Sequence, residues 1–114
     1  MRFHVLSLFP GLFECALSYG VVGRARERGH LQLDCTDIRD FARDRHRTVD
    51  DRPFGGGPGM VMRPDIVVES IRHARARMPE GAPVVHLSPQ GEPLNQERVA
   101  DLAALPGLTL LCGR

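Results

Sequence analysis

The chain has 114 residues, of which 42% are hydrophobic, and a formal net charge of +1. This length and composition indicate one globular domain, or part of one, that can bury roughly two-thirds of its unfolded surface. A net charge so close to zero provides no overall attraction to nucleic acid, and no apolar run approaches the length of a membrane span. The three cysteines form no Cys-x-x-Cys pair, which argues against a zinc ribbon or disulfide scaffold and fits a reducing cytoplasm.

Hydrophobic spacing predicts strands that alternate with helices. Nearly continuous apolar runs mark the strands at 3–9, 83–87 and 108–112, and alternation of apolar and polar residues marks the strand at 31–35. Apolar residues at helical spacing mark the helices, with Pro64 at a first position and Asn95 as an N-cap. Gly20 is expected to stop the first helix. The predicted elements are a strand at 3–9, helices at 12–17 and 21–28, a strand at 31–35, a helical turn at 38–41, a helix from 64 to 78, a strand at 83–87, a helix after 95 and a strand at 108–112.

This alternation predicts an α/β fold with a parallel sheet and helices on both of its faces. Ligands bind such sheets at the carboxyl ends of the strands, where the turn at 88–91 and Gly113 fall. Only Gly113 and Arg114 follow the last predicted strand, and no covering helix follows it. We therefore expect Leu108, Leu110 and Leu111 to be partly uncovered.

The stretch at 53–59 contains four glycines and two prolines, which predicts a shaped loop that a ligand or another chain approaches closely. It has no P-loop lysine, and Met60 stands where a dinucleotide-binding pattern begun at Gly55 needs its last glycine. Basic residues that suit phosphate precede the loop, although interleaved aspartates favour a neutralised, solvated face. These basic residues are Arg39, Arg43, Arg45, His46, Arg47 and Arg52.

Three segments resemble, in order, the motifs of one family. Segment 45–60, Arg-His-Arg-Thr-Val-Asp-Asp-Arg-Pro-Phe-Gly-Gly-Gly-Pro-Gly-Met, is similar to the first motif of the bacterial tRNA (guanine-N1)-methyltransferase family, TrmD, with Phe54 in place of the usual tyrosine. Segment 87–91, Leu-Ser-Pro-Gln-Gly, resembles the second motif, and segment 111–114, Leu-Cys-Gly-Arg, resembles the start of the third. Segments 6–10 and 19–25 fit the family's opening, so the resemblance covers the whole chain.

The resemblance implies a SPOUT-type methyltransferase, whose sheet ends in a trefoil knot that holds S-adenosylmethionine. It implies a cytoplasmic homodimer that methylates N1 of the guanine 3′ of a tRNA anticodon. Residues 1–114 then correspond to the N-terminal part of the SPOUT domain, with an incomplete knot and without the C-terminal helical domain that helps to bind tRNA. We expect this portion alone to be inactive.

The resemblance also assigns residues to the two ligands. The general base of the family is an aspartate in the C-terminal half, so no catalytic residue is assigned in this chain, and Asp50 is a substitute by position only. The residues implied for S-adenosylmethionine are Leu87, Ser88, Pro89, Gln90, Gly91 and Gly113. The residues implied for tRNA are Arg45, His46, Arg47, Asp50, Arg52, Gly55, Gly56, Gly57 and Gly59.

Two other functions remain open from the residues alone. One is a metal-dependent phosphoesterase that uses His46, Asp50 and Asp51, but neighbouring carboxylates in an extended segment point apart and rarely share one ion, so no metal site is predicted. The other is a module that dimerises or binds RNA without turnover.

Overall fold

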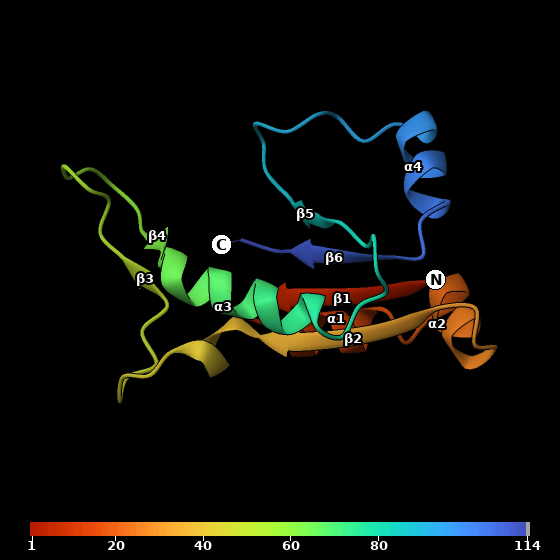
Figure 1. The fold of residues 1–114 in the computed structure, drawn as a ribbon, viewed down its shortest axis with the longest axis horizontal. Coiled ribbons are helices and arrows are strands. Elements are labelled where there is room, and N and C mark those ends of the chain that lie inside the picture. The colour runs from red at the N-terminus through yellow and green to blue at the C-terminus, as the bar shows by residue number, and fades with distance from the viewer. Residues whose placement is uncertain (114) are drawn as a thin grey trace.

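A computed structural model of the protein describes residues 1–113, and Arg114, the last residue of the third motif segment, lies outside the described residues. Strands and helices alternate as the sequence predicts, with boundaries that differ by a few residues (Figure 1). Within residues 1–113, no helix is long and apolar enough to cross a membrane. The elements are β1 (Arg2–Ser7), α1 (Pro10–Ala16), α2 (Gly20–Glu27), β2 (Gln32–Asp37), the 3-10 helix η1 (Ile38–Phe41), β3 (Asp50–Asp51), β4 (Val61–Met62), α3 (Pro64–Arg75), β5 (Val84–His86), α4 (Gln96–Ala103) and β6 (Gly107–Leu111).

Four parallel strands form the main sheet in the order β2-β1-β6-β5, which confirms the predicted parallel sheet (Figure 1). The register pairs Val5 of β1 with Cys35 of β2 on one side and with Leu110 of β6 on the other. On its far side, β6 pairs with β5, where Leu110 faces Val85. Because all four strands run the same way, their carboxyl ends meet at one edge of the sheet.

Helices cover both faces of the sheet, as predicted. Helix α3 lies in front of it in Figure 1, while α1 lies behind and contacts β1 and β2. Pro64 occupies the start of α3, where its missing N–H is not needed, and Ile66, Ser70 and Ala74 recur at intervals of four to form the buried face of the helix. Ile66 belongs to the same buried cluster as Leu6 of β1, so the main core lies between α3 and the sheet.

The last strand is better covered than the sequence suggests. Leu108 is 4% exposed and Leu111 is 8% exposed, while Leu110 is half-buried. The expectation that all three leucines are partly uncovered is therefore wrong for Leu108 and Leu111. Leu108 and Leu111 are buried because of the strand order. Strand β6 lies between β1 and β5, so it is an interior strand although it is the last in the chain.

The first two helices meet at a tight turn that the sequence assigns differently. Helix α1 ends at Ala16, and Gly20, at a φ of +65°, is the first residue of α2 rather than the stop of α1. The close approach lies at Gly23, where a Cβ would be 2.3 Å from the carbonyl oxygen of Ser18. Glycine is needed here because the backbone of the turn occupies the space of a side chain.

The shaped loop predicted at 53–59 connects the two strands of a β-hairpin that the sequence did not indicate. Strands β3 and β4 pair antiparallel, with Asp50 opposite Met62 and Asp51 opposite Val61. The glycine stretch closes this hairpin, which projects away from the main sheet (Figure 1). Each strand has two residues, too few to show the alternation by which strands are recognised in a sequence.

Candidate functional site

The turn after β5 and the segment after β6 lie beside each other at the carboxyl edge of the sheet. The backbone N–H of Leu87 donates to the carbonyl of Leu111 at 3.2 Å, which continues the pairing of the two strands. Ser88 then shapes the turn: its Oγ accepts from the N–H of Gln90 at 3.2 Å, and its carbonyl accepts from the N–H of Gly91 at 3.1 Å. A Cβ on Gly91 would lie 3.2 Å from that carbonyl oxygen, so glycine lets the turn close.

A cavity of about 700 Å³ opens beside this turn. Its volume falls in the range of small-molecule pockets, about 300 to 1,000 Å³. Four of the six predicted cofactor residues line it, and the hairpin, α1 and α3 supply the opposite wall. The lining residues are Phe13, Met60, Val61, Met62, Val67, His86, Leu87, Ser88, Pro89, Leu111, Cys112 and Gly113.

The other two predicted cofactor residues lie outside this cavity. Gly91 lines a neighbouring cavity of about 830 Å³ between the β5–β6 edge and α4, to which Leu87 and Ser88 also contribute. Gln90 is exposed and lines neither of these two cavities. The turn at 87–91 therefore lies where two cavities adjoin, and not within one of them.

The groups around the first cavity are neutral or weakly polar. A Cβ on Gly113 would lie 3.6 Å from Nε2 of His86, another residue that lines the cavity, so the absence of a side chain at Gly113 leaves this space free. Burial raises the pKa of the Cys112 thiol, so it remains protonated at neutral pH and is a poor nucleophile. With a mostly apolar lining, this cavity suits a ligand that is recognised largely by its shape.

The basic segment before the hairpin is a structured turn. The carboxylate of Asp44 accepts hydrogen bonds from the backbone N–H of Thr48 at 2.9 Å and from its hydroxyl at 2.7 Å. The bond from the Thr48 hydroxyl is the main reason that the pKa of Asp44 lies below its ordinary value. Within this turn, Arg47 has a φ of +50°, and its N–H donates to the carbonyl of Asp44 at 3.1 Å. Arg45 and His46 are therefore presented together at the end of the turn.

The residues predicted to bind tRNA differ in how freely their charges are available. The guanidinium of Arg47 forms an ion pair with Asp40 at 2.5 Å. Arg45, His46 and Arg52 are exposed and form no ion pair within residues 1–113. The structure thus leaves three of these basic residues accessible and gives the fourth a partner within the chain.

The glycines and Asp50 occupy opposite ends of the hairpin. Asp50 lies at its base, paired with Met62, whose side chain lines the 700 Å³ cavity. Gly55, Gly56, Gly57 and Gly59 lie at its end, all with positive φ. Adjacent strand residues point to opposite faces, so Asp50 and Asp51 diverge. In the described part of the chain, no group of three His, Cys, Asp or Glu side chains could hold a metal ion.

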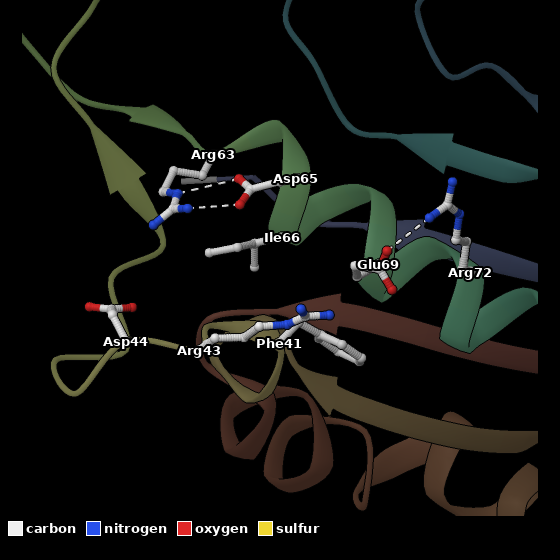
Figure 2. A pocket seen from close by; sticks show the side chains of 8 residues that line it. All are labelled: Phe41, Arg43, Asp44, Arg63, Asp65, Ile66, Glu69 and Arg72. Atoms are coloured by element: carbon white, nitrogen blue, oxygen red, sulfur yellow. Dashed lines mark hydrogen bonds and ion pairs between the residues drawn. The ribbon is translucent and has the colours of Figure 1, made fainter.

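A third cavity, of about 660 Å³, was not anticipated from the sequence (Figure 2). It lies between α3 and the segment after η1. Two ion pairs form among its lining residues: Arg63 with Asp65 at 2.7 Å, and Arg72 with Glu69 at 2.8 Å. The three-residue spacing of Glu69 and Arg72 on a helix was a signal for the second pair. Its eight lining residues, Phe41, Arg43, Asp44, Arg63, Asp65, Ile66, Glu69 and Arg72, carry three positive and three negative charges, so the cavity has no net preference for an anion.

These features define an α/β protein with a cavity at the carboxyl edge of its parallel sheet, beside a glycine-rich hairpin. The family model described as tRNA (Guanine-1)-methyltransferase TrmD matches residues 1–114. The chain belongs to this family.

Relatives and a solved structure agree with this assignment. The chain is 51% identical over 114 residues to the tRNA (guanine-N(1)-)-methyltransferase of Leptothrix cholodnii and covers 46% of that protein. It is 53% identical over 113 residues, 99% of the chain, to the enzyme of the same name from Halorhodospira halophila, of which it covers 43%. The crystal structure of tRNA (m1G37) methyltransferase from Aquifex aeolicus superposes on the whole chain with a TM-score of 0.87 at 35% identity, and the match covers 51% of that structure. The chain spans about half the length of the proteins that it matches.

Proposed function

We propose that the protein is the N-terminal part of the SPOUT domain of a tRNA (guanine-N1)-methyltransferase that uses S-adenosylmethionine. The observation that carries this proposal is the convergence of the turn at 87–91 and Gly113 on a cavity whose other wall includes Met60, Val61 and Met62 of the glycine-rich hairpin. Two of the three motif segments thus provide one wall of the cavity, and the first motif provides the end of the hairpin and, with Met60, part of the opposite wall.

The cavity fits S-adenosylmethionine in size and chemistry. Leu87, Pro89 and Val67 offer apolar surface to a nucleoside, and Gly113 leaves backbone groups accessible because it has no side chain. When bound, S-adenosylmethionine supplies an electrophilic methyl group. The role of the turn at 87–91 is to orient it, with Ser88 holding the turn and Gly91 allowing it to close.

The proposed substrate is a tRNA, methylated at N1 of the guanine 3′ of the anticodon. Arg45, His46 and Arg52 would meet its phosphates or base edges, since their side chains are exposed and form no ion pair within residues 1–113. Arg47, held by Asp40, would instead fix the shape of the turn that presents Arg45 and His46. We further propose a cytoplasmic homodimer in which the end of the hairpin, at 55–59, faces the cofactor of the partner subunit.

Methyl transfer needs a general base, because N1 of guanine is a poor nucleophile until its proton is removed. We assign no such base within this chain, so we expect it to bind ligands without turnover. Incubating the purified chain with unmodified tRNA and radiolabelled S-adenosylmethionine should give no methylated product. Turnover would refute this expectation and would place the base among residues 1–114.

Calorimetric titration with S-adenosylmethionine tests the cofactor proposal directly. We expect saturable binding near one site per chain, and Gly113→Val should weaken it at least about tenfold, or ~1.4 kcal/mol, because the added side chain enters the cavity. Gly11→Val is the matched control, since a Cβ on Gly11 meets no atom within 4 Å and the residue lies outside the cavity. Absence of binding by the folded protein would contradict the proposed pocket.

The rival function, a module that binds RNA or dimerises without using a cofactor, makes the opposite prediction in the same titration. It is favoured by one observation, the accessible charges of Arg45, His46 and Arg52. RNA binding without S-adenosylmethionine binding would favour this rival.

A further inference from the structure

Phe54 projects from the hairpin into solvent. Its relative exposure is 109%, against 73% for Tyr19, the next most exposed large hydrophobic residue in the described part of the chain. An exposed fraction this high means that the ring has almost no contact with the other residues of 1–113. Burial of such a side chain normally stabilises a fold, and that stabilisation is absent here.

The backbone holds Phe54 in this position. The N–H of Gly56 donates to the carbonyl of Pro53 at 3.0 Å, which closes a four-residue turn with Phe54 at its first corner. Gly55, at the second corner, has a φ of +86°, the conformation that a type II turn requires. The ring is therefore presented by the geometry of the turn rather than by side-chain packing.

The surroundings of the ring leave room for a planar partner. A Cβ placed on Gly55, Gly56 or Gly57 would meet no atom within 4 Å, so the space around these glycines, which follow Phe54 in the chain, is open. Arg52, two residues earlier, is exposed and forms no ion pair within residues 1–113. An exposed aromatic ring beside an available guanidinium is the combination that binds unpaired nucleotides, in which the ring stacks on the base and the cation meets the phosphate.

We propose that Phe54 stacks on an unpaired base of the substrate RNA while Arg52 contacts the adjoining phosphate. This inference rests on the proposed function and specifies the form of substrate: a single-stranded or loop region. N1 of guanine lies on the base-pairing edge, so an enzyme that methylates it must meet an unpaired base. Phe54 is then a positioning residue that holds the RNA chain near the hairpin.

A tryptophan reporter tests the stacking. The chain contains no tryptophan, so Phe54→Trp introduces a single fluorophore at the end of the hairpin. Titration with an RNA stem-loop whose loop carries an unpaired guanine should quench its fluorescence and shift its emission. A fully paired RNA of the same length should leave the emission unchanged. Equal quenching by both RNAs would overturn the proposal.

Two substitutions at Phe54 separate stacking from hydrophobic contact. Phe54→Leu should weaken binding of the stem-loop by about five- to 150-fold, the range for loss of one stacked base. Phe54→Tyr keeps the ring and should bind within about twofold of the original protein. Because Phe54 packs against almost nothing, both variants should retain the circular dichroism spectrum and the urea unfolding midpoint.

Salt dependence separates the ring from the charge. Arg52→Ala should reduce the slope of log affinity against log salt by about one, the contribution of a single phosphate contact to single-stranded RNA. Phe54→Leu should lower affinity without changing that slope. A change of slope in Phe54→Leu would contradict a stacking role.

The outcomes distinguish this inference from the function on which it rests. If the original chain binds no stem-loop RNA, the proposed interaction with tRNA is wrong, and so is the proposed stacking. If the chain binds RNA and Phe54→Leu binds equally well, only the stacking is wrong. In sedimentation, Phe54→Leu should have the same oligomeric state as the original chain. A shift of the variant to smaller species that accounts for the loss of RNA binding would place Phe54 in a subunit interface and overturn the proposal.

Discussion

Leu111 and Leu110 are neighbours on β6, yet the structure predicts very different costs for truncating them. Leu111 is 8% exposed and packs in the core cluster with Leu6 and Ile66. Leu110 points to the other face, is half-buried, and lines the 830 Å³ cavity beside α4. The pair thus compares one interior and one partly wet position within a single strand.

The expected magnitudes follow from burial. Leu→Ala removes the equivalent of about three methylene groups, or ~2.4 kcal/mol of transfer free energy when the side chain is fully buried. At Leu111 the cavity left behind adds to this, for a total loss of about 3 to 5 kcal/mol in the free energy of unfolding. At Leu110 the truncation removes roughly half of this transfer free energy, and water can fill the space. We therefore expect a loss of ~1 kcal/mol in the free energy of unfolding.

Urea unfolding followed by far-ultraviolet circular dichroism measures both losses. A domain of this length is expected to have a total stability of about 6 to 17 kcal/mol, so Leu111→Ala should move the midpoint far more than Leu110→Ala, with the slope of the transition unchanged. Equal losses, or a larger loss at Leu110, would refute the strand order in which β6 lies between β1 and β5. Because Leu111 also lines the proposed cofactor cavity, its truncation should weaken S-adenosylmethionine binding as well.

Three further predictions concern a buried histidine, a buried glycine and an exposed arginine. His4 is 1% exposed, and burial lowers its pKa below the ordinary value of 6.5, so the unfolded chain binds the proton more readily. The free energy of unfolding should therefore fall as the pH drops below about 6.5. His4→Gln should flatten that part of the profile of unfolding free energy against pH. Gly107→Ala should cost about 1 to 3 kcal/mol in urea unfolding, because its Cβ would lie 2.6 Å from the carbonyl oxygen of Arg2, whereas Gly11→Ala, with no atom within 4 Å, should cost nothing. In the full-length enzyme, Arg52→Ala should weaken tRNA use, measured as kcat/KM, more than S-adenosylmethionine binding; equal losses would count against its assigned role.

Several features of the fold could be read from the sequence because they depend on local patterns. Continuous apolar runs identified the positions of β1, β5 and β6, and alternation of apolar and polar residues identified β2. Apolar residues at helical spacing identified the buried face of α3. Alternation of these elements was enough to predict a parallel sheet, since parallel strands need a covering connection between them. The motif segments at 45–60, 87–91 and 111–114 were sufficient to indicate the family, which the family model confirmed.

Other features depend on contacts between distant residues, and the sequence was silent or misleading about them. Strands β3 and β4 are stable only because they pair with each other, and two residues show no periodicity. The same limit applies to the charges: spacing alone could not show that Asp40 would form an ion pair with Arg47, while Arg45 forms none within residues 1–113.

The sequence by itself determined the order of the elements, the class of the sheet and the family, because each of these is carried by residues close together in the chain. Only the tertiary structure decided that β6 lies inside the sheet, which buries Leu108 and Leu111 and brings Gly113 beside Ser88 and Pro89. The physical reason is that strand order is chosen by how the whole sheet buries its surface. No local pattern along the chain records that choice.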